Sequence, residues 1–126
     1  MQKIEKDNLP DLKELILEGI KQKKGKDIVI LDFEKIESAV CQYFIVCHGS
    51  SNTQTDAIAG SIEKLVKENV GTRPWHKEGY ENSQWILLDY GEAIVHIFQE
   101  EYRQHYKLED LWADAEITRI EDDINE

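Results

Sequence analysis

Gly49, Ser50 and Ser51, with Asp56 a few residues further on, form the first cluster of residue types that could do chemistry. Backbone amides at the start of a helix attract anions, so this segment is a candidate phosphate-binding loop. The segment has neither the lysine of a Walker A motif nor the three-glycine spacing of a dinucleotide fingerprint. A polar loop that caps the next helix is therefore the favoured interpretation.

Asp89 and His96 form a second cluster, on two apolar segments that flank Gly91. If these segments make a hairpin, the two side chains share a face and lie diagonally across it, within reach of a hydrogen bond. A polar pair that closes one end of a core is favoured over a general base, because the sequence shows neither a nucleophile nor a substrate pocket.

Metal and thiol chemistry would depend on two cysteines and four histidines. They form neither a Cys-x-x-Cys pair nor a helical histidine pair, so we expect no metal site and no cofactor. Cys47 and His48 are adjacent, but neighbouring strand residues point to opposite faces, so the imidazole cannot easily activate the thiol. Buried thiols in a reducing compartment are the simpler interpretation.

The elements that would position these residues centre on a predicted hairpin over residues 84–99. Gly91-Glu92 suits a two-residue type II′ turn, which pairs Trp85 with Phe98 and Leu88 with Val95. One face of the hairpin then holds Trp85, Leu87, Asp89, Ile94, His96 and Phe98, and the other holds Ile86, Leu88, Tyr90, Ala93, Val95 and Ile97. Both faces are mostly apolar, so we expect both to be covered. Trp85 and Phe98 are either core residues or an exposed anchor for a partner.

Periodicity places the remaining elements around this hairpin. A first helix would start at Pro10, with Asn8 as cap, and run to Lys24, where Gly25 in a left-handed conformation stops it. Strands over 27–32 and 42–47 would pair as neighbours, and a second helix would follow residues 48–53 and end at 69–71. A right-handed parallel crossover would lead to an edge strand over 72–77. Residues 100–106 and 108–113 are predicted to be helical.

Composition limits the function classes. The 126 residues fit one domain over 1–113, and an acidic tail over 114–126 is expected to be flexible. A formal net charge of -11 disfavours direct binding to nucleic acid or anionic lipid and favours a basic protein partner. The N-terminal residues lack the apolar stretch of a signal peptide and no run is long enough to cross a membrane, so we expect a cytoplasmic protein.

A family resemblance rests on the segment from Trp85 to Phe98, on Glu100 to Tyr106 and on Leu108 to Trp112. With Lys24 to Ile28, Asp32 to Ser51 and Glu78-Gly79, these segments resemble the ribosomal silencing factor family, also called Iojap-like. The resemblance implies an α/β domain with a mixed sheet of about five strands flanked by helices. This domain is nucleotidyltransferase-like but lacks the catalytic carboxylates.

The same resemblance implies a function. The protein would be a homodimer-prone translational repressor that binds ribosomal protein number fourteen on the large subunit and blocks joining of the small subunit when nutrients are short. It would not be an enzyme. Partner contacts are expected on the hairpin and its flanks, with apolar anchors and acidic complements at Trp85, Phe98, Tyr90, Asp89, Glu92 and Glu78.

The sequence leaves two alternatives open. The chain could be a nucleotidyltransferase-type enzyme that uses Ser50, Asp56 and Asp89, although the paired carboxylates that hold two metals are missing. It could also be a purely structural dimer without a ribosomal partner.

Overall fold

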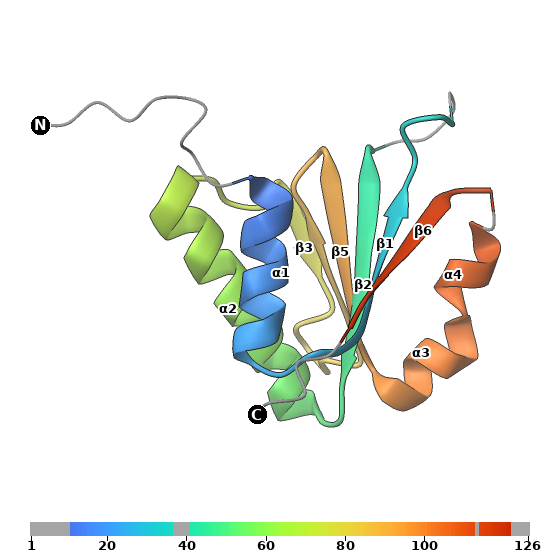
Figure 1. The fold of residues 1–126 in the computed structure, drawn as a ribbon. Helices are drawn as coiled ribbons and strands as arrows, with labels where there is room; N and C mark the ends of the chain where they lie inside the picture. Colours follow the sequence, from blue (N-terminus) through green and yellow to red (C-terminus); the bar gives the residue numbers. More distant parts are fainter. Residues whose placement is uncertain (1–10, 37–40, 113, 122–126) are drawn as a thin grey trace, which may run out of the picture.

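A six-stranded mixed sheet organises the molecule (Figure 1). The computed structural model describes residues 11–36, 41–112 and 114–121. The strands lie in the order β3-β4-β5-β2-β1-β6, one strand more than the sequence predicts. The elements in chain order are α1 (Leu12–Gln22), β1 (Lys26–Asp32), β2 (Tyr43–Gly49), α2 (Asn52–Val70), β3 (His76–Glu78), β4 (Trp85–Asp89), β5 (Ala93–Gln99), α3 (Glu100–Tyr106), α4 (Leu108–Leu111) and β6 (Glu116–Ile120).

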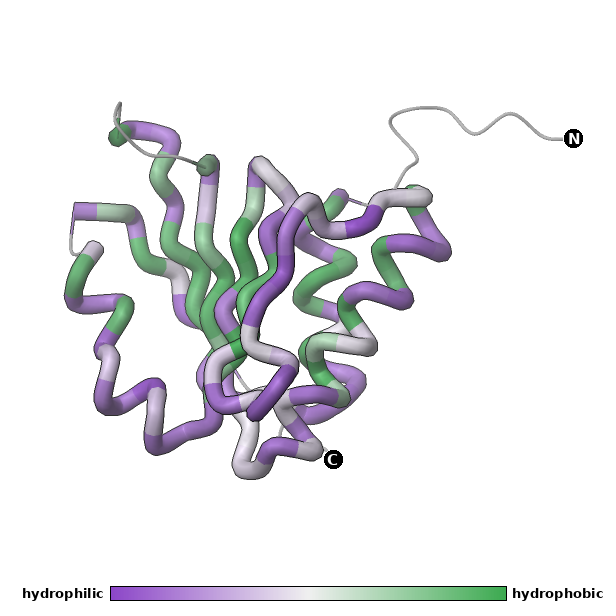
Figure 2. The backbone as a smooth tube through the Cα atoms, turned by 180° about the vertical axis from the view of Figure 1, so that it is seen from behind, coloured by the Kyte–Doolittle hydropathy of each residue, from purple (hydrophilic) through white to green (hydrophobic). Residues whose placement is uncertain are grey.

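Helices cover both faces of the sheet: α1 and α2 lie on one side, and α3 and α4 on the other (Figure 1). Two hydrophobic cores result, one under each layer. The larger core joins Ile16 and Ile20 of α1 and Ile58 of α2 to the sheet. The smaller core gathers Leu108 of α4 with residues from β1, β2 and β5. The central strands accordingly contain the most hydrophobic residues, while the helices alternate between hydrophobic and hydrophilic residues (Figure 2). The α/β single-domain prediction is confirmed.

The β4–β5 hairpin has the predicted register. Trp85 pairs with Phe98 and Leu88 with Val95. Gly91 has a φ of 90°, the positive value that a glycine at the first turn position provides. The two predicted faces go to different cores: one set of alternating residues joins the larger core, and Phe98 joins the smaller one.

The chain leaves β2, passes through α2 and reaches the edge strand β3, as predicted. The predicted bounds of that strand are wrong: residues 72–75 are not strand, and β3 spans only His76–Glu78. Because β3 and β5 are both antiparallel to β4, β3 runs in the same direction as β2. The parallel neighbour of β2 is nevertheless β5, which returns from the hairpin to pair with it along its whole length. Strands β1 and β2 pair as neighbours, as predicted, and the pairing is antiparallel.

Helix ends follow local chemistry, with two corrections. Ser51 caps α2 and Gly71 ends it at a φ of 68°, as predicted. Helix α1, however, begins at Leu12 with Asp11 as its cap, so the predicted start at Pro10 is wrong; the predicted cap Asn8 lies outside the described residues. Lys24, not Gly25, takes the left-handed conformation, with a φ of 60°.

Gly25 is needed for a different reason. A Cβ at this position would lie 2.4 Å from Cγ2 of Ile20, so a side chain would collide with the end of α1.

The segment after α4 forms a strand, where the sequence predicts a flexible tail. Residues 116–120 form β6, which pairs antiparallel with β1 at one edge of the sheet. Its side chains are mostly exposed, so the segment carries little of the hydrophobic signal that marks a strand in a sequence. Residues 122–126 lie outside the described part of the chain. Among the described helices, none has the length and apolar character required to cross a membrane.

Candidate docking surface

Trp85 lies at the open end of the hairpin, half-buried in an aromatic stack. Its ring stacks on Phe98 with centroids 4.9 Å apart and packs against Tyr106 at 4.8 Å. Phe98 has no exposed surface, whereas Tyr106 is 46% exposed. The stack therefore begins in the core and ends at the surface, with Trp85 between the two.

A hydrogen bond fixes the orientation of Trp85. Its indole Nε1–H donates to Nδ1 of His96 over 3.1 Å. Because Nδ1 accepts this bond through its lone pair, it carries no proton and the imidazole is neutral. Burial lowers the pKa of His96 to about 4, which keeps the ring neutral at physiological pH. The predicted hydrogen bond between His96 and Asp89 is wrong. Asp89 instead accepts from the backbone N–H of Gly91 over 2.8 Å and braces the turn.

The face of β4 that carries Trp85 is only partly covered. Helix α3 packs mainly on β5 and β2, so Trp85 and Leu87 keep part of their surface exposed. Glu78 pairs with Leu87 across the β3–β4 ladder and is exposed, so its side chain shares this face. We call the surface formed by Trp85, Leu87, Glu78, Asp89 and Tyr106 the β4 surface.

The six predicted contact residues thus divide between surface and core. Trp85, Asp89 and Glu78 lie on the β4 surface, and Glu92 is exposed at the hairpin turn. Tyr90 and Phe98 are 4% and 0% exposed, so they are core residues that cannot touch a partner directly. Sequence reasoning missed Tyr106, because the pairing of α3 with the hairpin end is a tertiary contact.

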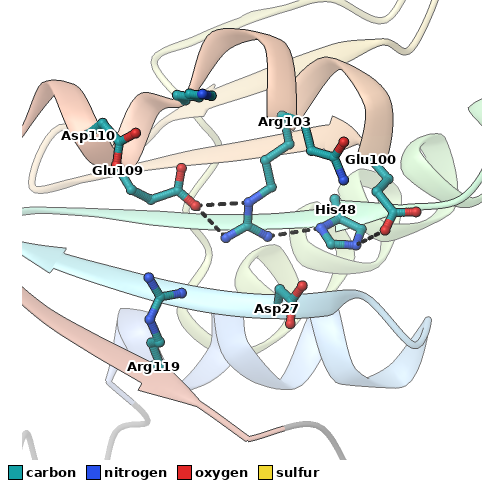
Figure 3. Close-up of a pocket in the computed structure, with 9 residues that line it drawn as sticks. Asp27, His48, Glu100, Arg103, Glu109, Asp110 and Arg119 are labelled. Atoms are coloured by element: carbon teal, nitrogen blue, oxygen red, sulfur yellow. Dashed lines mark hydrogen bonds and ion pairs between the residues drawn. The ribbon is translucent and has the colours of Figure 1, made fainter.

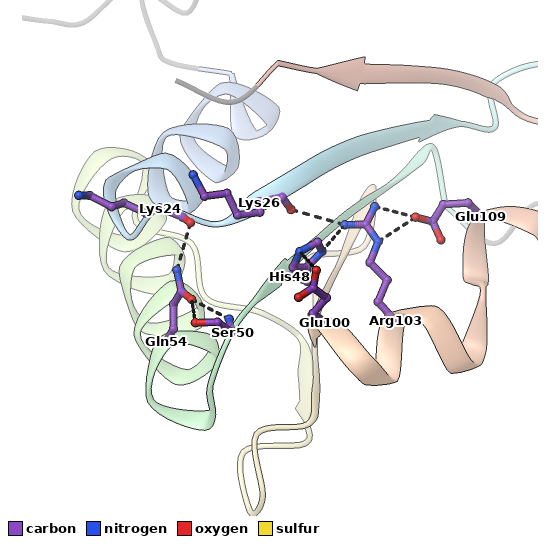
Figure 4. Close-up of polar contacts among 8 residues, drawn as sticks. All are labelled: Lys24, Lys26, His48, Ser50, Gln54, Glu100, Arg103 and Glu109. Atoms are coloured by element: carbon purple, nitrogen blue, oxygen red, sulfur yellow. Dashed lines mark hydrogen bonds and ion pairs between the residues drawn. The ribbon is translucent and has the colours of Figure 1, made fainter. Parts of the chain in front are cut away.

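The candidate phosphate loop is occupied by the protein's own side chain (Figure 4). Oε1 of Gln54 accepts from the backbone N–H of Ser50 over 2.7 Å and from its hydroxyl over 3.0 Å. Nε2 of Gln54 donates to the carbonyls of Lys23 and Lys24, each over 3.1 Å. The loop caps α2 and ties it to the end of α1, which supports the structural interpretation over phosphate binding.

The residues of the alternative enzyme are not assembled. Ser50 follows the end of β2, which pairs with the end of β5 at Gln99. Asp89 pairs with Ile94 at the start of β5. Ile94 and Gln99 are five residues apart on β5, and Ser50 lies one residue beyond the pair at Gln99. Ser50 and Asp89 are therefore roughly 20 Å apart. Asp56 is exposed on α2, and a separation of this size means that no single metal ion can be bound by all three side chains.

A buried ion-pair cluster lies at the end of β2 opposite the hairpin turn (Figures 3 and 4). Arg103 is 8% exposed, and its Nε and one terminal nitrogen donate to Oε1 of Glu109 over 2.9 and 2.6 Å. The other terminal nitrogen lies 3.0 Å from Nδ1 of His48 and 3.4 Å from the carbonyl of Lys26. Nε2 of His48 in turn lies 3.7 Å from Glu100.

This cluster holds α3 and α4 against the sheet. Burial raises the pKa of the Glu109 carboxyl, but hydrogen bonds from its own backbone and from Arg103 outweigh burial, so the pKa lies below its ordinary value. The spacing of Arg103 and Glu109 is not a helical one. The two residues meet because Lys107, with a φ of 47°, breaks the helix between them. Sequence periodicity could not reveal this pair.

Thiol and metal chemistry find no support in the described residues. Burial raises the pKa of Cys47 to about 12 and that of Cys41 to about 11, so neither thiol is a ready nucleophile. Within residues 11–36, 41–112 and 114–121, no three His, Cys, Asp or Glu side chains gather into a group that could hold a metal ion.

The chain is similar to one protein family and to several known proteins. A family model described as "Ribosomal silencing factor during starvation" matches residues 6–126. The chain is 39% identical over 104 residues to the ribosomal silencing factor of Bacillus subtilis, covering 82% of this chain and 86% of the relative. It is 36% identical over 111 residues to that of Halalkalibacterium halodurans, covering 88% and 93%. A crystal structure of a protein from Chromobacterium violaceum superposes with a TM-score of 0.76 at 37% identity, covering 81% of this chain and 83% of that one.

Proposed function

Because this chain belongs to the ribosomal silencing factor family, we propose that it represses translation by binding the large ribosomal subunit and blocking access of the small subunit. Ribosomal protein number fourteen is the proposed contact on the large subunit, and nutrient limitation is the proposed condition. A ribosome-associated silencing role follows from the family. What we propose beyond the family role is the contact with ribosomal protein number fourteen, the steric block of subunit joining and the dependence on nutrient limitation.

The observation that carries the proposal is the incompletely covered β4 surface. A monomer with helices on both faces of its sheet could have buried Trp85 entirely, yet the α3 layer leaves Trp85 and Leu87 partly exposed beside Tyr106. Tryptophan and tyrosine are the residue types that most often dominate binding energy in interfaces. The hydrogen bond to His96 holds the indole in place, so little side-chain freedom is lost on binding.

Charge supports a basic partner. Glu78 and Asp89 lie on the β4 surface and Glu92 lies at the adjoining turn, and the chain as a whole carries a net charge of -11. Such a charge distribution mainly accelerates association with a basic protein surface and disfavours acidic competitors. The apolar contacts at Trp85 and Tyr106 then determine how slowly the complex dissociates.

Co-sedimentation with purified ribosomal subunits tests the proposal. The unmodified chain is expected to pellet with large subunits and to stay in the supernatant with small ones. Trp85→Ala should weaken binding to the large subunit about 30-fold, the equivalent of a 2 kcal/mol hot spot. Leu111→Ala, which removes a side chain that is 72% exposed on α4, is the matched control and should bind normally. Circular dichroism must first show that both variants are folded; undiminished binding by folded Trp85→Ala would remove the anchor role.

A homodimer remains part of the proposal. The two edge strands, β3 and β6, have exposed side chains and lie at opposite ends of the sheet, and an open strand edge is a ready site for pairing with another chain. Sedimentation equilibrium of the purified protein tests this: a dimer is expected at micromolar concentration, and a monomer at all concentrations would contradict it.

A further inference from the structure

We propose that the protein also carries a site for unpaired, single-stranded RNA on the surface between α2 and β3. The site consists of the basic residues that line a cavity there, Lys64, Lys67, Arg73 and Lys77, and of the exposed Trp75, which lies between Arg73 and Lys77 in the chain. We call it the β3 patch. That the RNA would be ribosomal rests on the function proposed above; binding of RNA by the patch does not.

The β3 patch reverses the charge of the molecule locally. A cavity of about 630 Å³ between α2 and β3 is lined by four basic residues and two acidic ones, whereas the whole chain has 15 basic and 26 acidic residues. Of the two acidic residues, Glu63 already bonds with Lys77 over 3.2 Å and accepts from the hydroxyl of Tyr80. Lys64, Lys67 and Arg73 are exposed at the rim, opposed there by Glu68.

Trp75 supplies the apolar part of the patch. Its side chain is 79% exposed, the most exposed of the large apolar side chains in the described residues. Its backbone N–H donates to the carbonyl of Asp89 over 2.7 Å. Its ring lies so close to the hairpin turn that a Cβ at Gly91 would come within 2.7 Å of the Trp75 Cη2 atom. One part of the indole is therefore held against the turn while most of its surface faces solvent.

Trp75 lies beside the cavity along the chain. Pro74, the residue before it, lines the cavity, and so do Arg73 and Lys77, each two residues from it. Lys77 also contacts Glu63 of α2. The exposed indole therefore lies within a few residues of the basic lining, at the start of the edge strand β3.

Structural roles account for only part of this arrangement. Lys67 lies in the last turn of α2, where a cation stabilises the helix dipole, and Lys77 is paired with Glu63. Lys64, Arg73 and the exposed indole gain nothing evident from the fold. Cations near an accessible aromatic ring suit single-stranded nucleic acid, because phosphates pair with the cations and a base stacks on the ring. Anionic lipid would need a larger apolar surface than one indole.

Fluorescence anisotropy with a fluorescein-labelled 12-nucleotide oligouridylate tests the proposal on the full chain. The protein should bind the oligonucleotide saturably at low salt. Trp75→Ala should weaken binding about tenfold or more, as expected for loss of one base-stacking contact. The double variant Lys64→Gln/Lys67→Gln should lower the slope of log K against log salt by about 1.4, since each phosphate contact on a single strand contributes about 0.7.

Two controls separate the site from general electrostatics and from ribosome docking. Lys23→Gln/Lys24→Gln removes the same charge from the exposed end of α1 and should leave RNA affinity unchanged. Trp85→Ala should also bind RNA normally, so a failure of the docking surface leaves this result intact. The inference is overturned if the oligonucleotide does not bind saturably, if the Lys23→Gln/Lys24→Gln control loses as much affinity as the patch variants, or if the protein binds phosphatidylserine vesicles but not RNA.

Discussion

Trp85, on β4, and Trp75, just before the neighbouring edge strand β3, have opposite environments. Trp85 is stacked between Phe98 and Tyr106 and donates a hydrogen bond to His96. Trp75 rests on a glycine turn and is 79% exposed. The first residue is part of a core that reaches the surface, and the second is attached to the fold mainly through its backbone. Residue type alone therefore does not separate an anchor from a core residue; the neighbours do.

The same contrast holds for the regions around them. The α3 side of the sheet contains a buried ion pair, a neutral buried histidine and an aromatic stack. The β3 edge contains a three-residue strand with exposed side chains and exposed ion pairs. We expect substitutions on the α3 side to change folding stability, and substitutions at the β3 edge to change only what the surface binds.

The largest difference should come from ion pairs on the two sides. Arg103→Met leaves Glu109 without its buried partner and should lower the free energy of unfolding by about 3–5 kcal/mol. Lys77→Met breaks the exposed pair with Glu63 and should change the free energy of unfolding by less than about 1 kcal/mol. Urea unfolding followed by circular dichroism measures both. Equal losses would show that the α3 side is not more tightly held than the β3 edge.

Acid should weaken the α3 side next. The pKa of His96 is lowered to about 4 in the fold, from an ordinary value of 6.5. A lowered histidine pKa means that the unfolded chain binds a proton first, so stability is full above pH 6.5 and falls as the pH drops toward 4. The loss over this window should be about 3 kcal/mol. The pKa of Glu109 is also lowered in the fold. Its protonation therefore reduces stability further only when the pH falls below the ordinary pKa of a glutamate.

His96→Asn is the control for this pH dependence. Its amide oxygen can still accept from Trp85, but the side chain does not titrate. Urea midpoints of this variant should vary much less between pH 6.5 and 4.5 than those of the unmodified chain. An equally steep decline in the variant would assign the acid sensitivity to other groups.

The matched pair of tryptophan substitutions should give the smallest stability difference. Trp85→Ala removes a half-buried ring and leaves His96 without its donor, at a cost of about 2–3 kcal/mol. Trp75→Ala should change stability by less than about 0.5 kcal/mol, because the ring is mostly in water. Thermal unfolding of the two variants measures the contrast directly. A large loss for Trp75→Ala would mean that its contact with the turn contributes to the fold.

Local signals explain what the sequence predicted well. The hairpin register follows from period-2 alternation and one glycine at the turn, and the ends of α2 follow from Ser51 and Gly71. Each of these signals lies within a few residues of the structure that it determines. The pairing of β1 with β2 as neighbours also needs only a short connection.

Features that depend on distant partners were missed. Strand β6 has few buried side chains and exists because β1 offers an open edge. Arg103 meets Glu109 and His48 only after Lys107 breaks the helix and β2 and β5 lie side by side. Total charge likewise concealed the basic β3 patch, because a sum over the chain carries no information about position. Of the predicted contact residues, Tyr90 and Phe98 could not be assigned to the core before the coverage of each face was known.

Hydroxyl-radical footprinting of the protein, free and bound to purified large ribosomal subunits, tests the docking surface most directly. Mass spectrometry would follow oxidation of Trp85 and Tyr106, with Ile117 on the far edge strand as the exposed internal reference. We predict that oxidation of Trp85 and Tyr106 falls several-fold on the large subunit and is unchanged by small subunits. Bound protein in which both side chains stay as reactive as in the free chain would contradict the assignment of the β4 surface.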